Sequence, residues 1–305
     1  MEERTAFVFP GQGSQSVGMG QRWYECYPVA VAEFYEQAEA ALGFDIKKLI
    51  FNGPEAELSL TENAQPAILL DSIIKDHLLK AQGVRPEIAL GHSLGEYSAL
   101  VSAGVVSLED GLRLVRKRGR LMQEAVPIEQ GAMVAILGLA FDQVVEICEA
   151  VEGIAEVANY NSPTQIVISG NRDAVLEAAN RAQEAGAIRT IELEVSAPFH
   201  CSLMAPAQAG LKRKIAAVKF RRPAFPVIMT VSGQLETESK VIKELLTRQI
   251  TSPVRWVDYI ERLRPEGIER TIEVGPGQVL TGLNRRITRE MEHLRFSDAI
   301  KAKAS

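Results

Sequence analysis

Short apolar runs alternate with longer stretches of helical periodicity along the chain. The runs Thr5-Ala-Phe-Val-Phe9 and Ile88-Ala-Leu90 are mainly apolar and end at loops that contain glycine or proline, which is typical of buried strands. Residues 21–50 and 61–82 repeat alanine, leucine and isoleucine at helical spacing, and Gly53-Pro54 separates the two stretches. This alternation of buried strands and helices predicts an α/β fold.

The pattern changes after Val126-Pro127 and predicts a second, smaller unit. Its elements follow the order β-α-β-β-α-β, which is the ferredoxin-like arrangement. The expected strands are 131–137, 156–160, 165–169 and 188–195, the expected helices are 142–152 and 173–184, and a turn is expected at Asn161-Ser162-Pro163. We therefore predict a small subdomain at residues 128–197, inserted into a catalytic domain formed by residues 1–127 and 198–305.

The pattern of the larger domain resumes after the insertion. A helix is expected from Ser196 to about Val218, and a closing helix is expected after Gly277. Between them the sequence predicts a strand at 226–231, helices at 240–249 and 256–263, and a last strand and turn at 271–277.

The sequence Gly91-His-Ser-Leu-Gly95 is a G-x-S-x-G motif between a predicted strand and a predicted helix. In that context the serine projects from a sharp turn, and the two glycines remove side chains that would clash as strand and helix meet. The helix that starts near Leu94 directs N–H groups and the positive end of its dipole toward this turn. A glycine-rich turn with an incidental serine is the alternative, but the strand-before and helix-after context favours Ser93 as a nucleophile.

A serine nucleophile needs a base, and the four histidines are the candidates. His77 and His293 lie in polar segments that we expect to be helical and at the surface. His92 is adjacent to Ser93 and is expected to point away from it, whereas His200 follows Pro198 at a loop-to-helix junction. His200 is therefore the best base. No acidic residue stands at an obvious strand end between Ser93 and His200, so a dyad, with His200 held by a carbonyl or an amide, fits better than a triad.

The predicted helix at 108–124 carries a basic stripe and one basic residue outside it. Arg113, Arg116, Lys117 and Arg120 follow i, i+3, i+4, i+7 spacing, which is usually a solvated helix face and is alternatively a docking surface. Arg118 lies about 100° further round the helix than Lys117. It is therefore a candidate for an inward direction.

Composition excludes several classes of function. The 305 residues carry a net charge of −5, which does not favour nucleic acid, and no apolar stretch is long enough for a membrane span. The acidic start of the chain is unlike a signal peptide. The widely spaced Cys26, Cys148 and Cys201 fit neither a disulfide framework nor a zinc site, and they fit a reducing cytoplasm. The loop Pro10–Gln15 lacks the residues of a dinucleotide or Walker phosphate motif.

Several of these segments together resemble the malonyl-CoA:acyl carrier protein transacylases. The resemblance spans nearly the whole chain, in order and spacing. It is carried by Phe7–Gln15, Gly91–Leu100, Arg118-Gly119, Asn161–Pro163, Pro198–His200 and Glu273–Gly277. It implies an α/β-hydrolase-like core with a parallel sheet, together with the ferredoxin-like subdomain.

The resemblance also implies roles for individual residues. Ser93 matches the nucleophile that accepts the acyl group, and His200 matches its base. The backbone N–H groups of Gln12 and Leu94 match the oxyanion hole, and Arg118 matches the arginine that binds the malonyl carboxylate. Gln249 matches a glutamine near the site, although the sequence alone would favour a surface amide at a helix end. Cys201 and Thr164 depart from the common family pattern at positions outside the proposed chemistry.

The implied partners are malonyl-CoA and acyl carrier protein, with no metal or redox cofactor, and a cytoplasmic monomer is expected. A free-standing acyltransferase of a polyketide pathway is a rival with the same fold. An acyl-thioester hydrolase is a second rival, but it has no need of Arg118 to hold a free carboxylate. A non-catalytic module that docks a carrier protein is the third, and the intact Ser93, His200 and Gln12 argue against it.

Overall fold

The larger sheet has six strands and is almost wholly parallel. The computed structural model describes residues 3–127, 129–195 and 197–300, and in it the strand order is β10-β9-β1-β2-β7-β8. Only β8 runs antiparallel to its neighbour. The bounds are Thr5–Phe9 for β1, Ile88–Gly91 for β2, Val227–Ile228 for β7, Leu235–Glu236 for β8, Arg270–Glu273 for β9 and Glu292–Arg295 for β10.

Strands β1 and β2 are buried on both faces, which explains why their sequences are apolar without alternation. Phe7 and Phe9 pack in the main core with residues of α5 and α7, whereas Ala6 and Val8 pack in a second cluster with residues of α12 and α13. The helices of this domain are α1 (Gln21–Cys26), α2 (Pro28–Leu42), α3 (Ile46–Asn52), α4 (Glu55–Leu58), α5 (Thr61–Ala81), α6 (Gly95–Ser102), α7 (Leu108–Ala125), α10 (Ala205–Ala217), α11 (Ser239–Arg248), α12 (Trp256–Leu263), α13 (Val279–Ile287) and α14 (Phe296–Ala299).

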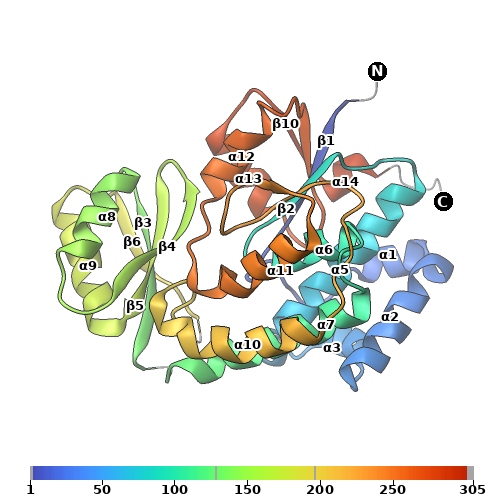
Figure 1. Ribbon diagram of the computed structural model, residues 1–305, viewed down its shortest axis with the longest axis horizontal. Coiled ribbons are helices and arrows are strands. Elements are labelled where there is room, and N and C mark those ends of the chain that lie inside the picture. The colour runs from blue at the N-terminus through green and yellow to red at the C-terminus, as the bar shows by residue number, and fades with distance from the viewer. Residues whose placement is uncertain (1–2, 128, 196, 301–305) are drawn as a thin grey trace.

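The smaller sheet is antiparallel, with strand order β4-β5-β3-β6 and a core of its own. With two helices it forms the predicted β-α-β-β-α-β arrangement, which lies at the left of Figure 1 beside the larger domain. Its elements are β3 (Gly131–Leu137), α8 (Phe141–Glu149), β4 (Ala155–Ser162), β5 (Gln165–Asn171), α9 (Arg172–Glu184) and β6 (Arg189–Glu192). The predicted α/β class, with a parallel core and a separate ferredoxin-like unit, is therefore confirmed. The boundary at residues 128–197 stays a prediction.

Backbone hydrogen bonds join the two units close to the site. Tyr160 N donates to Val254 O at 2.8 Å, and Val254 N donates to Ala158 O at 2.9 Å. Strand β4 is therefore tied directly to the segment between α11 and α12. In the described part of the chain, no helix is long and apolar enough to cross a membrane.

Three predictions about local structure were wrong. Asn161 and Ser162 belong to β4 rather than to a turn, because β4 pairs with β5 as far as Ser162. The helix expected from Ser196 begins only at Ala205, after a 3₁₀ turn at Ser202–Met204, and Ser196 itself lies outside the described residues. Strand β10 was missed, because its sequence Glu-His-Leu-Arg gives no apolar run and it forms by pairing with β9.

The contact between β2 and α6 generates a stability prediction. A Cβ atom added at Gly91 would lie 1.9 Å from the carbonyl carbon of Gly95. Gly91→Ala should therefore lower the free energy of unfolding by about 1–3 kcal/mol, the usual range for overpacking. Gly282→Ala in α13 is the control, because nothing lies within 4 Å of its added Cβ. That change should be neutral or stabilising by up to about 1 kcal/mol. Urea unfolding followed by circular dichroism measures both, and equal effects would contradict the close approach.

Candidate active site

Ser93 stands at a strained turn between β2 and α6. Its φ angle is 52°, in the left-handed region that non-glycine residues rarely occupy. A Cβ added at Gly95 would lie 2.0 Å from Phe9 O, so the start of α6 lies against the end of β1 as well as β2. The backbone contacts therefore fix the direction in which the Ser93 hydroxyl projects. Such strain persists where the surrounding structure over-determines it, often at functional sites.

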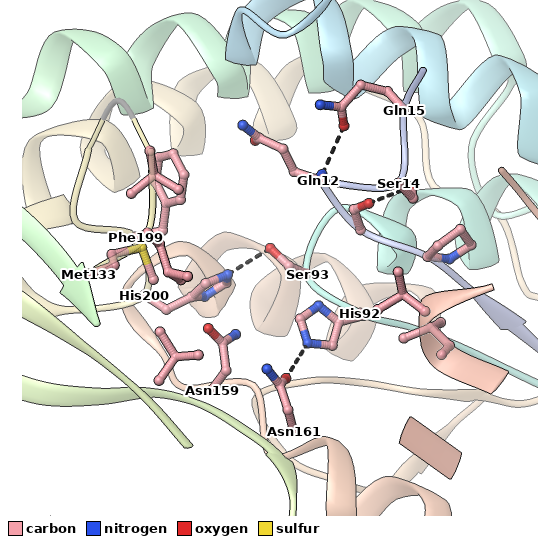
Figure 2. A pocket seen from close by; sticks show the side chains of 18 of the residues that line it. Gln12, Ser14, Gln15, His92, Ser93, Met133, Asn159, Asn161, Phe199 and His200 are labelled. Carbon is pink, nitrogen blue, oxygen red and sulfur yellow. Dashed lines mark hydrogen bonds between the residues drawn. The ribbon is translucent and has the colours of Figure 1, made fainter. Parts of the chain in front are cut away.

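His200 is the second strained residue, with φ 59°, and its ring meets Ser93. Among the described residues these two are the non-glycine positions with positive φ. His200 Nε2 lies 2.6 Å from Ser93 Oγ, and His200 Nδ1 lies 2.9 Å from the carbonyl oxygen of Ser252 (Figure 2 shows the first contact). A carbonyl only accepts hydrogen bonds, so Nδ1 carries the proton and Nε2 can accept the proton of Ser93. The geometry is that of a dyad oriented by a backbone carbonyl.

The environment of His200 favours its neutral form. The side chain is 3% exposed. Burial, as the larger cause, and the positive charge of Arg118 together lower the pKa of His200 to about 3. The imidazole is therefore unprotonated at neutral pH, as a general base must be.

Arg118 points inward from α7 and ends beside the dyad. Its side chain is 1% exposed, and its Nη2 donates to Ser93 Oγ at 3.0 Å. Nη2 also donates to Gln249 Oε1 at 3.1 Å, and Nη1 donates to Gln65 Oε1 at 3.0 Å. Within the described ranges, no carboxylate lies within ion-pair distance of the guanidinium. Burial lowers the pKa of Arg118, but a guanidinium stays charged in proteins. A buried positive charge therefore faces the site, held only by neutral acceptors.

The cavity in front of Ser93 has a volume of about 440 Å³ and lies between the two units. The larger domain contributes the loop Pro10–Gln15, Ser93 and Arg118. The smaller unit contributes Met133, Asn159 and Val167 from its strands. Phe199, Met122 and Leu193 add apolar surface. The space therefore combines one cation with mainly apolar walls, which suits a short acyl chain that ends in a charge.

The predicted oxyanion donors lie at this cavity. Gln12 is in the loop that lines it, and its side-chain amide is turned to Thr61 Oγ1 at 3.1 Å. Leu94 precedes the first residue of α6, where the N–H groups of Gly95 and Glu96 bond to the carbonyls of His92 and Ser93. The role of the Gln12 and Leu94 backbone N–H groups as oxyanion donors stays a prediction.

The other histidines take no part in the dyad. His92 Nε2 lies 2.8 Å from Asn161 Oδ1, so His92 points away from Ser93 toward the smaller unit, as expected (Figure 2). His77 is exposed, also as expected. The prediction for His293 was wrong, because it is buried in β10 between Thr271 Oγ1 and the carbonyl of Thr288.

Sequence reasoning missed several residues that shape the site. Gln65, Asn161 and Ser252 each hold a site residue through one hydrogen bond, and Glu96 is fully buried beside Gln249. No sequence signal marks Gln65 or Ser252, since their roles depend on contacts across more than 50 residues. Glu96 directly follows the G-x-S-x-G motif, and a charged residue in an otherwise apolar helix could have been singled out. Cys201 is a buried packing residue whose Sγ contacts Pro198 O at 3.1 Å.

The comparisons with known proteins agree with one another. The model of the family described as acyl transferase domain matches residues 6–300. Two malonyl CoA-acyl carrier protein transacylases are each 46% identical to the chain. The one from Bacillus subtilis aligns over 97% of this chain and 94% of its own length, and the one from Escherichia coli K12 over 92% of both.

Solved structures give the same result. An acyl carrier protein S-malonyltransferase from Vibrio cholerae has a TM-score of 0.95 at 42% identity, covering 98% of this chain and all of that one. A malonyl-transacylase solved with a type II polyketide acyl-carrier protein has a TM-score of 0.94 at 40% identity, covering 97% of this chain and 99% of that one. The chain belongs to the acyl transferase domain family, in which its similar relatives are malonyl-CoA:acyl carrier protein transacylases.

Proposed function

We propose that this chain is a malonyl-CoA:acyl carrier protein S-malonyltransferase of fatty acid biosynthesis. It moves the malonyl group from coenzyme A to the phosphopantetheine thiol of acyl carrier protein. The observation that carries this proposal is the buried guanidinium of Arg118, which lies 3.0 Å from the Ser93 hydroxyl and has no ion-pair partner in the described part of the chain. A malonyl thioester bound at Ser93 supplies that carboxylate.

The first half of the reaction forms an ester on Ser93. His200 Nε2 takes the Ser93 proton as Oγ attacks the thioester carbonyl carbon of malonyl-CoA. Backbone N–H groups of Leu94 and Gln12 stabilise the negative charge that develops on the carbonyl oxygen. The carbon–sulfur bond then breaks, the leaving thiolate takes the proton from His200, and coenzyme A departs.

The second half repeats these steps in reverse order with a different thiol. His200 takes the proton of the phosphopantetheine thiol, whose sulfur attacks the ester carbonyl. The bond to Ser93 Oγ breaks, and His200 returns the proton to Oγ. The cycle is ping-pong and proceeds without a metal or redox cofactor.

Arg118 selects the acyl group. Its planar guanidinium can bind a carboxylate through two parallel hydrogen bonds, so it fixes orientation as well as charge. Gln249 and Gln65 hold the guanidinium through their carbonyl oxygens and leave its charge for the substrate. An acyl-thioester hydrolase for uncharged chains would have no use for this group.

The carrier protein is the macromolecular partner in this proposal. A similar malonyl-transacylase has been solved with a type II polyketide carrier protein, so a polyketide pathway remains the second candidate. The basic stripe on α7 is partly engaged within the fold: Arg116 Nη1 donates to Leu42 O at 2.5 Å, and Arg120 pairs with Glu62 at 2.8 Å. A docking role for this stripe stays a prediction. We also propose a cytoplasmic monomer, and the three free thiols fit a reducing compartment.

Intact-mass analysis tests the covalent step. Incubation with malonyl-CoA should add one malonyl group to the wild-type chain, and carrier protein with its phosphopantetheine should then remove it. Ser93→Ala should form no adduct and keep the wild-type thermal midpoint, because the change removes only a hydroxyl. An adduct on Ser93→Ala at a rate near wild type would show that another residue is the nucleophile.

The pH dependence of acylation tests His200. Because its pKa is lowered to about 3, the neutral base persists well below the ordinary histidine value of about 6.5. The rate of the first acylation should therefore be nearly constant between about pH 5 and 8 and fall only in more acid solution. In Arg118→Ala the loss of the neighbouring charge should shift the acid limb for acetyl-CoA upward. The acylation rate is measured by rapid quench. If the wild-type rate fell around pH 6.5, the lowered pKa of His200 would be wrong.

Substitution of Arg118 tests the choice of substrate. Arg118→Ala should reduce kcat/KM for malonyl-CoA by about 3–5 kcal/mol of transition-state stabilisation, the scale for breaking a buried pair. The value for acetyl-CoA should fall much less, because acetyl has no carboxylate. Lys117→Ala, on the outward stripe of the same helix, is the control and should leave the ratio of the two substrates unchanged. Equal losses for both substrates in Arg118→Ala would remove the malonyl assignment.

A further inference from the structure

Glu96 is a fully buried carboxylate one turn from the nucleophile, and the proposed mechanism does not use it. It lies in the first turn of α6 and is 0% exposed. Its Oε2 accepts hydrogen bonds from Thr230 N at 3.2 Å, from Thr230 Oγ1, and from Gln249 Nε2 at 2.9 Å. In the described ranges, no lysine or arginine forms an ion pair with it. A buried carboxylate is costly, so its retention beside the site calls for a role.

The contacts of Gln249 fix which way its amide faces. Gln249 is fully buried, and its Nε2 donates to Ser93 O at 2.7 Å and to Glu96 Oε2. The Ser93 carbonyl only accepts, and Glu96 Oε2 accepts two hydrogen bonds from Thr230, so the NH₂ end of the Gln249 amide must face these two oxygens. The oxygen end is thereby turned toward Arg118 Nη2 at 3.1 Å. A reversed amide would place oxygen against oxygen on one side and N–H against N–H on the other.

The orientation of Gln249 in turn positions Arg118. The same Nη2 atom that donates to Gln249 also donates to Ser93 Oγ. A continuous series of contacts therefore runs from Glu96 through Gln249 to the guanidinium and the nucleophile. Glu96 itself does not line the cavity.

We infer that Glu96 is a positioning residue for substrate selection: it fixes the Gln249 amide so that Arg118 is held ready for the malonyl carboxylate. The inference rests on the proposed function of Arg118. A positioning role can be told from mere support of the fold. Loss of a residue that only supports the fold would slow the transfer of charged and uncharged acyl groups alike. The quantity that distinguishes the two roles is the ratio of kcat/KM for malonyl-CoA to that for acetyl-CoA.

Glu96→Ala should lower this ratio by roughly tenfold, the scale of one lost hydrogen bond to a charged group. Glu96→Gln should keep a ratio near wild type, because an amide oxygen can replace Oε2 and the NH₂ group can occupy the place of Oε1. In the wild-type side chain, Oε1 has no hydrogen-bond partner among the described residues. If Glu96→Ala does not fold, Glu96→Met fills a similar volume without an acceptor and takes its place.

Two further variants complete the test. Thr230→Val removes one donor to Glu96 and leaves Gln249 untouched, so it should lower stability while the substrate ratio stays near wild type. In an Arg118→Ala background, Glu96→Ala should produce no further change in the ratio, because coupled residues are not additive.

The outcomes separate the inference from the proposed function. An unchanged ratio in folded Glu96→Ala, or equal losses in Glu96→Ala and Glu96→Gln, would overturn the positioning role. The second of these results would assign the effect to the charge of Glu96 rather than to the amide. If wild type showed no preference for malonyl-CoA over acetyl-CoA, or Arg118→Ala kept that preference, the proposed function would itself fail.

Discussion

A permanent positive charge is buried beside Ser93 without an ion-pair partner among the described residues, and the site is built around this constraint. Arg118 is 1% exposed and bonds to two glutamine oxygens and to Ser93 Oγ. The neutral oxygens that accept hydrogen bonds from Nη1 and Nη2 do not cancel its charge, which a carboxylate would do. The same charge helps to keep His200 neutral. The proposed recognition of the malonyl carboxylate and part of the lowering of the His200 pKa thus depend on one side chain.

The site also depends on the meeting of the larger domain and the smaller unit at the cavity. Ser93 and Arg118 come from the larger domain, whereas Met133, Asn159 and Val167 come from the strands of the smaller one. The two are joined next to the reacting atoms, by the His92–Asn161 contact and by the backbone bonds of β4 to Val254. The shape of the cavity therefore depends on how the small sheet is held against the Ser93 turn.

The sequence predicted those parts of the site that local patterns encode. Strand β1 and the Ser93 turn follow from apolar runs and glycine spacing, and the structure agrees with both. Helical geometry only made Arg118 a candidate for an inward direction, which the structure shows it to have. The sequence could not predict the contacts of Gln65 and Ser252 with site residues or the burial of His293, because these depend on which distant segments pack together. Strand β10 was not predicted for the same reason, because it forms by pairing with β9 and its composition does not indicate a strand.

The carbonyl of Ser252 holds His200 where many serine enzymes have a carboxylate, and this bears on how long the proposed ester survives. The carbonyl orients the imidazole and raises its pKa, but burial and the charge of Arg118 outweigh this effect, so His200 is a weak base. A thiol, with a pKa of about 8.5, needs little help to lose its proton. Water is a much weaker acid than a thiol and needs a great deal of help. A weak base thus favours attack by a thiol over attack by water, so the proposed malonyl ester would resist hydrolysis and react when a thiol arrives.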